Sequence, residues 1–172
     1  MIVLGIDVGT TGTKTLALDE NGAVLGRGYM EYELITHAGG IVEQSAEDWY
    51  KAVVESVRQA AAELDKSDIT ALSLSTQGDS MLAVDRDFNP LCNVITWMDL
   101  RSKAESDYLN EKLGTVRIYK KTGYKIGPSI DAPKIIWIRS HMPEITDKTY
   151  NYICNSSGIY LVFNNITYDY FS

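Results

Sequence analysis

One carboxylate beside a turn of small residues is the group in this sequence that could do chemistry. Asp7 ends an apolar run that begins at Met1, and the turn that follows leads into a second apolar run, residues 16–18. Glycine lets the backbone approach a ligand closely, and successive N–H groups in such a turn form a concavity that binds anions. The candidate phosphate-binding residues of the turn are Gly9, Thr10, Thr11, Gly12, Thr13 and Lys14.

Asp7 is also the candidate metal ligand. Mg²⁺ keeps several water molecules and takes one or two carboxylates together with phosphate oxygens. A carboxylate at the end of a strand, next to an anion-binding turn, therefore predicts a site for the phosphates of a nucleotide and their Mg²⁺. A plain β-hairpin with a Gly- and Thr-rich turn is the alternative, and on the turn alone it stays open.

Two better-known phosphate motifs do not fit the spacing. A P-loop needs adjacent Gly and Lys followed by a helix, but Thr13 separates Gly12 from Lys14 and the next residues favour a strand. A Rossmann fingerprint needs G-x-G-x-x-G at the start of a helix, which Gly5, Gly9 and Gly12 do not supply. What remains is a strand, an acid, a Gly-Thr-Thr turn and a second strand.

The surrounding pattern indicates which elements position this turn. Asn21-Gly22 is a strong hairpin signal, so residues 23–32 are predicted to add a third strand and complete an antiparallel meander. Ser45 with Asp48 resembles a capping box, and apolar residues recur at helical spacing through residues 46–65. The short apolar run 69–75 then predicts a buried parallel strand, whose end leads into the polar loop 76–80.

The second half of the sequence predicts further short elements. Residues 81–84 and 91–97 favour a hairpin, 101–113 favours a surface helix that stops at Gly114, and 116–129 shows little pattern. Residues 133–142 favour a helix over a strand because Pro133 suits a first helical turn and Pro143 ends the run. The expected architecture is α/β, a mixed sheet in which a three-stranded meander precedes βα units, with helices on both faces.

Composition limits the class of protein and its partners. A chain of 172 residues with 45% hydrophobic and 23% charged residues has room for one domain with a sizeable core. The net charge of −7 argues against a nucleic-acid or anionic-membrane surface, and no apolar run approaches the ~20 residues that span a bilayer. Cys92 and Cys154 lie far apart, which fits a reducing cytoplasm. A homodimer is compatible with the sequence.

Several stretches together resemble one family. The Asp7 turn is similar to the first phosphate loop of the actin-like ATPase superfamily, whose fold is ribonuclease H-like. Behind it, in order, come Glu43-Gln44-Ser45 with Asp48-Trp49, then Ser75-Thr76-Gln77-Gly78-Asp79-Ser80, Trp97-Met98-Asp99-Leu100-Arg101, and Ala132-Pro133-Lys134 with Trp137. Their joint order resembles the N-terminal domain of the FGGY carbohydrate kinases, most closely the xylulokinase-like branch.

This resemblance implies ATP- and Mg²⁺-dependent phosphorylation of a hydroxyl on a pentulose or related, xylulose-like sugar. Asp7 would lie near Mg²⁺ and the γ-phosphate, and Gln77, Gly78, Asp79, Asp99 and Arg101 would contact the sugar. For Asp99 and Arg101 a structural ion pair or helix cap is an equal alternative, and for Asp79 the alternative is an N-cap or Asx-turn residue. Many xylulokinases carry Met-His where this chain has Gly78-Asp79, so the sugar stays open.

The resemblance also implies that residues 1–172 are an N-terminal sugar- and phosphate-binding domain that is apparently truncated. In the family the general base and the C-terminal ATP-binding domain lie beyond position 172. A Leu-Thr-Gly turn is expected where residues 162–164 read Val-Phe-Asn, and only Asp169 matches the acid that usually follows. We therefore expect the chain alone to be inactive. The alternatives are a non-catalytic sugar-binding or regulatory relative, or a chaperone- or actin-like ATPase domain.

Overall fold

The computed structural model describes residues 1–154. These residues form two compact units. Unit 1 contains Met1–Glu33 and Ser45–Gln77, and unit 2 contains Leu34–Gln44 and residues 78–154. Each unit has its own sheet. Positions 162–164 and Asp169, named above for the expected turn, lie outside the described residues.

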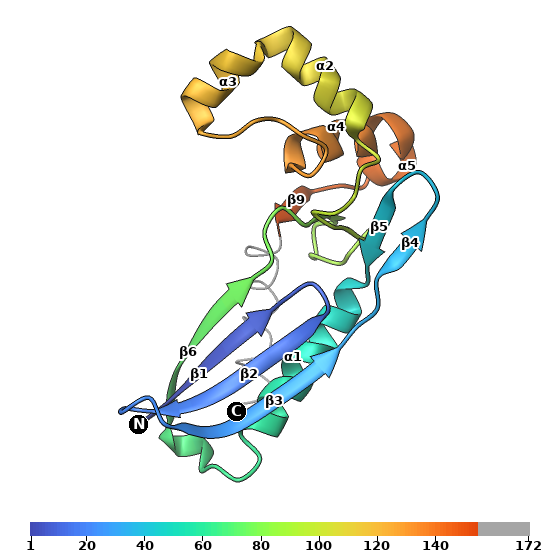
Figure 1. The fold of residues 1–172 in the computed structure, drawn as a ribbon. Helices are drawn as coiled ribbons and strands as arrows, with labels where there is room; N and C mark the ends of the chain where they lie inside the picture. The colour runs from blue at the N-terminus through green and yellow to red at the C-terminus, as the bar shows by residue number, and fades with distance from the viewer. Residues whose placement is uncertain (155–172) are drawn as a thin grey trace. The chain divides into compact units, whose positions relative to one another are not determined.

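Unit 1 is a four-stranded sheet with the strand order β3-β2-β1-β6 (Figure 1). The predicted meander is confirmed, since β2 pairs antiparallel with both β1 and β3. β6 pairs parallel with β1, as expected for a strand that follows a helical crossover. The strands are β1 (Ile2–Val8), β2 (Gly12–Asp19), β3 (Val24–Glu31) and β6 (Ile69–Thr76).

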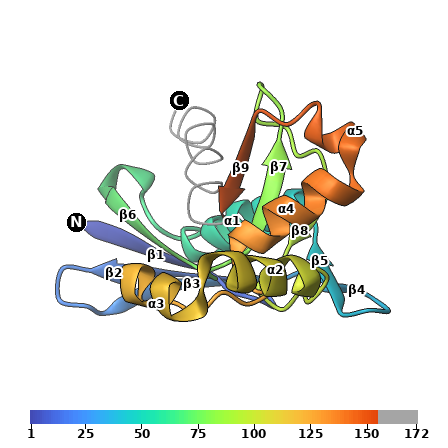
Figure 2. The ribbon, with the colours of Figure 1, turned by 90° about the horizontal axis from the view of Figure 1, so that it is seen from above.

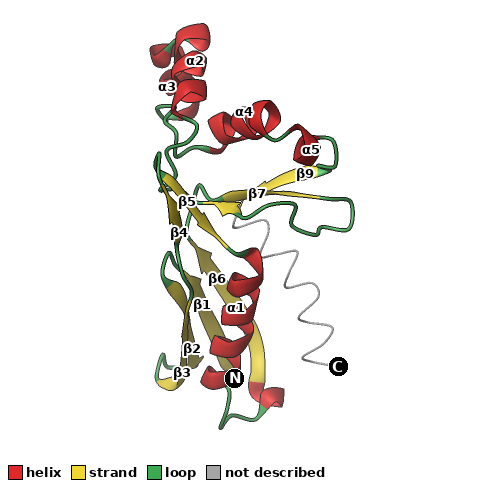
Figure 3. Cartoon of the chain, turned by 90° about the vertical axis from the view of Figure 1, so that its right-hand side faces the viewer, coloured by secondary structure: helices red, strands yellow, loops and turns green. Residues whose placement is uncertain are grey.

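One long helix, α1 (Ala46–Ala60), covers one face of this sheet (Figure 3). The Ser45 side chain accepts a hydrogen bond from the Asp48 N–H at 3.1 Å, as the capping pattern predicted. Alternate residues of β1 face the helix, and Ile6 and Val8 pack with Val53. The helix ends five residues earlier than the predicted 65, and η1 (Lys66–Asp68) follows before β6.

Gly28 explains how closely α1 approaches β3. A Cβ built there would lie 1.8 Å from the Ser56 carbonyl oxygen, and one at Gly26 would lie 2.0 Å from that of Ala60. Only a residue without a side chain fits so near a helix backbone.

The prediction that β6 is buried is wrong in the described part of the chain. β6 forms an edge of the four-stranded sheet, and most of its residues are exposed, with Leu72 at 40%. The apolar run correctly indicated a strand. Such a run does not show whether other elements of the fold pack against the strand's two faces.

Unit 2 contains a five-stranded sheet with the order β4-β5-β8-β7-β9. β9 lies antiparallel beside β7 (Figure 2), and β8 joins β5 to β7. The predicted hairpin is therefore present, but its second strand is only two residues long. The strands are β4 (Ile35–His37), β5 (Ile41–Gln44), β7 (Met81–Val84), β8 (Val94–Ile95) and β9 (Asn151–Cys154).

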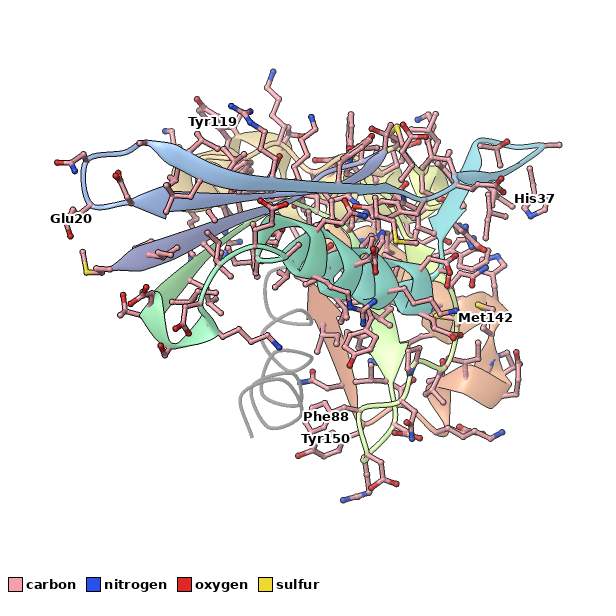
Figure 4. The ribbon with its side chains drawn as sticks, turned by 90° about the horizontal axis from the view of Figure 1, so that it is seen from below. Glu20, His37, Phe88, Tyr119, Met142 and Tyr150 are labelled. Atoms are coloured by element: carbon pink, nitrogen blue, oxygen red, sulfur yellow. The ribbon has the colours of Figure 1, made fainter. Side chains whose placement is uncertain are left out.

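The helices of unit 2 are α2 (Lys103–Leu113), α3 (Thr115–Thr122), α4 (Asp131–His141) and α5 (Pro143–Thr146). α4 confirms the helical alternative for residues 133–142, and its Ile138 packs in the core against Met81 and Ile95. α3 was not predicted. Figure 4 shows His37 at the end of the β4–β5 hairpin and Phe88 beside Tyr150, with ring centroids 6.1 Å apart.

The α/β class and the mixed strand directions expected from the sequence are confirmed. The described strands form two sheets, however, where one was expected. Among residues 1–154 no helix is long and apolar enough to cross a membrane.

Candidate functional site

The turn between β1 and β2 carries the predicted phosphate-binding residues. Asp7, the penultimate residue of β1, is exposed; it is paired across the sheet with Lys14 in β2 and with Ser75 in β6. The Gly9 N–H donates to the Gly12 carbonyl at 3.1 Å and closes the turn. The turn thus lies at the carboxyl end of β1, the edge at which open α/β sheets bind ligands.

Tyr32 lies beside this turn and forms two hydrogen bonds with it. Its backbone N–H donates to the Thr11 carbonyl at 3.3 Å, and its hydroxyl donates to the Gly9 carbonyl at 2.5 Å. The Tyr32 ring packs against Trp49, with centroids 6.4 Å apart. Burial raises the pKa of the Tyr32 hydroxyl to about 12, and the negative charge of Asp7 adds to this. The phenol therefore stays protonated and remains a donor to the turn.

Gly12 fills a place that admits no side chain. A Cβ there would lie 2.7 Å from the Met30 carbonyl oxygen and 2.8 Å from the Tyr29 ring. The neighbouring Lys14 is exposed, and its ammonium lies 5.8 Å from the centroid of the same ring. Local sterics thus fix the backbone of the turn while leaving a cation accessible beside it.

Gln77 joins this first group of residues. It follows β6, and its N–H donates to the Val8 carbonyl at 2.9 Å, directly before the turn. All the candidates that the structure places in unit 1 therefore share one end of its sheet: Asp7, Gly9, Thr10, Thr11, Gly12, Thr13, Lys14 and Gln77.

The donors at this end fit one kind of Mg²⁺ site. No group of three or more potential ligands from His, Cys, Asp and Glu occurs among residues 1–154, so a cage made only of protein side chains does not fit. The exposed carboxylate of Asp7 beside the glycine- and threonine-rich turn fits an ion that brings phosphate oxygens and water with it.

The remaining candidates lie in unit 2, and one of them has unusual backbone geometry. Asp79 is exposed and has a φ of +50°, a left-handed conformation that is uncommon for a residue other than glycine. The next residue, Ser80, is buried. Its hydroxyl accepts a hydrogen bond from the Trp97 N–H at 3.1 Å and lies 3.3 Å from the Gly78 carbonyl. The 78–80 loop is therefore linked to the segment that carries Asp99.

Asp99 and Arg101 form the centre of a buried ionic network. Asp99 is fully buried, and its Oδ2 accepts hydrogen bonds from the Val42 N–H at 2.7 Å and from Arg101 Nη2 at 2.7 Å. Its Oδ1 accepts from the backbone N–H and Nε of Arg101, both at 2.9 Å. Arg101 Nη2 also lies 2.6 Å from the Glu43 carboxylate.

This network favours the structural alternative for the pair. The Arg101 side chain is 5% exposed, and its guanidinium lies 4.9 Å from the centroid of the Trp137 ring. Burial opposes the charged form of Arg101, but the hydrogen bonds that its guanidinium donates to Asp99 and Glu43 outweigh burial and raise the arginine pKa. Since both Asp99 oxygens are engaged by protein donors, direct contact of Asp99 with a sugar stays a prediction.

Sequence reasoning assigned no role to four residues that the structure places around these groups. They are Tyr32, Glu43, Lys134 and Trp137. Glu43, Lys134 and Trp137 belong to stretches singled out by the resemblance, so their place in those motifs was the available signal. Tyr32 gave none, because a tyrosine at the end of a strand is ordinary.

Known proteins resemble this chain over most of its length. It is 34% identical over 169 residues to the gluconokinase of Bacillus subtilis, which covers 98% of this chain and 33% of that protein. The xylulose kinase of the same organism is 31% identical over 149 residues, covering 86% and 30%. The crystal structure of a xyloylose kinase from Brucella ovis has a TM-score of 0.86 at 27% identity, covering 94% and 34%.

The chain thus spans about a third of the length of the curated relatives it matches. The model of one family, described as the N-terminal domain of the FGGY family of carbohydrate kinases, matches residues 2–168. Since this match covers nearly the whole sequence, the chain belongs to the FGGY family of carbohydrate kinases.

Proposed function

We propose that this chain is the sugar- and phosphate-binding N-terminal domain of an ATP-dependent kinase that phosphorylates a sugar hydroxyl. One observation carries the proposal: in a chain matched by the family model, an exposed carboxylate is the penultimate residue of β1, next to a turn of closely packed glycines and threonines. Phosphoryl transfer depends mainly on positioning and on neutralising charge, and this turn offers both.

In this proposal the backbone N–H groups of the turn and the Lys14 ammonium bind phosphate oxygens. Asp7 holds the Mg²⁺ that accompanies the nucleotide, and that ion neutralises charge on the phosphates. Tyr32 keeps the turn in shape through its two hydrogen bonds to carbonyl groups. The base that takes the proton from the sugar hydroxyl, and the rest of the nucleotide site, come from outside this chain.

Asp79 is the proposed contact to the sugar. Its carboxylate is exposed, and such a group can accept hydrogen bonds from two neighbouring hydroxyls. Gln77 and Gly78 directly precede it in the chain. In this proposal Asp99 and Arg101 have a structural role: their network supports the segment that the Ser80–Trp97 hydrogen bond links to the loop. Direct contact of Asp99 and Arg101 with the sugar is the alternative.

The proposed substrate is a pentulose of the xylulose type. An aldonate such as gluconate is the second candidate, because the gluconokinase of Bacillus subtilis is 34% identical to this chain while the xylulose kinase of that organism is 31% identical. The two differ in chemistry, since gluconate carries a carboxylate that would lie near the acidic Asp79 only with a compensating cation.

Calorimetric titration of the 172-residue chain with D-xylulose, D-gluconate and glycerol tests both parts of the proposal. We expect weak binding of one sugar and no release of ADP when ATP is added. Asp79→Ala should abolish the sugar binding, whereas the exposed Asp107→Ala on α2 should not. Rapid ATP-dependent phosphorylation by this chain alone, or binding of none of the three compounds, would contradict the proposal.

A further inference from the structure

Lys134 is a fully buried charged residue in the middle of unit 2. It lies on α4, and its ammonium group donates to two backbone carbonyls, that of Asp79 and, at 2.7 Å, that of Ser129. Within residues 1–154 it forms no ion pair shorter than 4 Å. A buried ammonium is costly unless the protein compensates it, so its position calls for a physical reason.

The first reason lies in the backbone of the residue that Lys134 binds. Asp79 has a left-handed conformation that residues with a Cβ adopt rarely. A cation bound to the Asp79 carbonyl fixes the orientation of the peptide that follows, and hence the direction in which the exposed Asp79 side chain leaves the loop. On the other side of that peptide, the buried Ser80 hydroxyl accepts the Trp97 N–H at 3.1 Å.

The second reason is charge. The negative charges of Asp131, Asp79 and Asp99 favour the charged form of Lys134, so they partly offset the effect of burial on the lysine pKa. Burial still dominates and lowers the lysine pKa. Lys134 thus places a positive charge in the interior of unit 2, where three acids favour it.

The same helix supports the neighbouring segment. Trp137 follows Lys134 by three residues and therefore lies on the same side of α4. Its ring stacks on the Arg101 guanidinium, which binds Asp99. α4 therefore contacts both stretches of unit 2 that carry predicted sugar-binding residues.

We propose that Lys134 is a positioning residue that holds the 78–80 loop in its left-handed form and thereby sets the affinity of Asp79 for the sugar. The part of this inference that concerns sugar affinity rests on the proposed function. The part that concerns the conformation of the loop does not. A lysine that only filled the core would leave the loop and the binding of sugar unchanged when replaced by a side chain of similar size.

The test uses the 172-residue chain and Lys134→Met, which keeps the length of the side chain and removes its charge. Lys134→Gln serves as a second variant that retains a donor, in case the first does not fold. Substitution of the buried Ile138 on the same helix by Val or Ala, chosen to match the loss of melting temperature, is the control for general destabilisation.

The first measurement is amide hydrogen exchange of Trp97, whose N–H is bound to Ser80, relative to the β7 amides of Met81 and Leu82. We expect at least tenfold faster relative exchange in Lys134→Met and no change in the Ile138 control. Equal behaviour of the two variants would overturn the proposal, whether or not any sugar binds.

The second measurement is sugar affinity in a double-mutant cycle with Asp79→Ala. We expect Lys134→Met to weaken binding at least tenfold when Asp79 is present and less than twofold when it is absent. The same loss in both backgrounds would show that Lys134 does not act through Asp79. Failure of the unaltered chain to bind any sugar would instead contradict the proposed function, and the exchange measurement would still decide the role of Lys134.

Discussion

The β1–β2 turn of unit 1 and the Arg101 network of unit 2 position their side chains by different means. The turn is a single stretch of the chain, shaped by two glycines and held by hydrogen bonds to carbonyls, with Asp7 and Lys14 left exposed. The network joins Glu43, Asp99 and Arg101 and buries their charges. In the first region the charged groups are accessible to a ligand, and in the second they are engaged with one another.

Charge by itself therefore does not mark a ligand contact. Asp7 and Asp99 both lie in stretches that the sequence resemblance singled out, yet one is exposed and the other is fully buried with both oxygens accepting hydrogen bonds. We expect substitution of Asp7 to affect chemistry and substitution within the network to affect stability. Four measurements test this contrast.

The largest effect is expected for Asp7→Asn in the longer kinase of which this chain is the proposed N-terminal domain. Loss of the carboxylate should lower the rate of phosphoryl transfer by a factor on the order of 10³, because charge on the phosphates is no longer balanced in the same way. Stability should stay within about 0.5 kcal/mol, since Asp7 is exposed. Steady-state kinetics and thermal unfolding measure the two quantities. The exposed Glu63→Gln is the control, and a near-normal rate for Asp7→Asn would remove Asp7 from the site.

The second effect concerns the network. Arg101→Met leaves two carboxylates without their partner, which should cost about 3–5 kcal/mol and lower the melting temperature by roughly 10 °C. Lys103→Met is the matched control, because Lys103 and Asp107 are also 2.7 Å apart but are 71% and 64% exposed. That control should change stability by less than about 0.5 kcal/mol. Equal losses in calorimetry would mean that burial does not distinguish the two pairs.

A third measurement compares one glycine from each unit. Gly12→Ala places a methyl group 2.7 Å from the Met30 carbonyl oxygen, so the turn must shift at a cost of about 1–3 kcal/mol. Gly78→Ala meets no heavy atom within 4 Å and should stay within about 0.5 kcal/mol. Urea unfolding of both variants gives the two values, and the contrast fails if Gly78→Ala is the more harmful.

The smallest effect is a dependence on alkaline pH. The folded-state pKa of Tyr32 is raised from 10.0 to about 12. The stability that its protonated form contributes is therefore complete below pH 10 and is lost as pH rises toward 12. Difference absorbance at 295 nm between the unaltered chain and Tyr32→Phe should show a phenol that titrates near pH 12. Titration of that phenol near pH 10 would show that Tyr32 does not hold Gly9 as described.

The elements that could be predicted are those with a long local pattern. The meander, α1 and α4 followed from turn chemistry, a cap and helical spacing, each of which acts within a few residues. α3 was missed because only Ile118 in its eight residues is buried, although Gly114 and Gly123 bound it. The exposure of β6 and the division into two sheets depend on which elements pack together, and a strand's own residues do not encode that.

By itself the sequence determined the β1–β2 turn, its acid, its lysine and the family to which they belong. The backbone conformation of a tight turn depends on steric contacts between residues close in sequence. The residues that form the turn are therefore contiguous, and the turn can be recognised from the sequence. The tertiary structure decided that Asp99 is buried with Arg101 and Glu43, and that Lys134 reaches Asp79 across 55 positions. A buried charge needs a compensating partner, and the fold can supply that partner from a residue far away in the sequence. A short sequence motif therefore does not identify the partner.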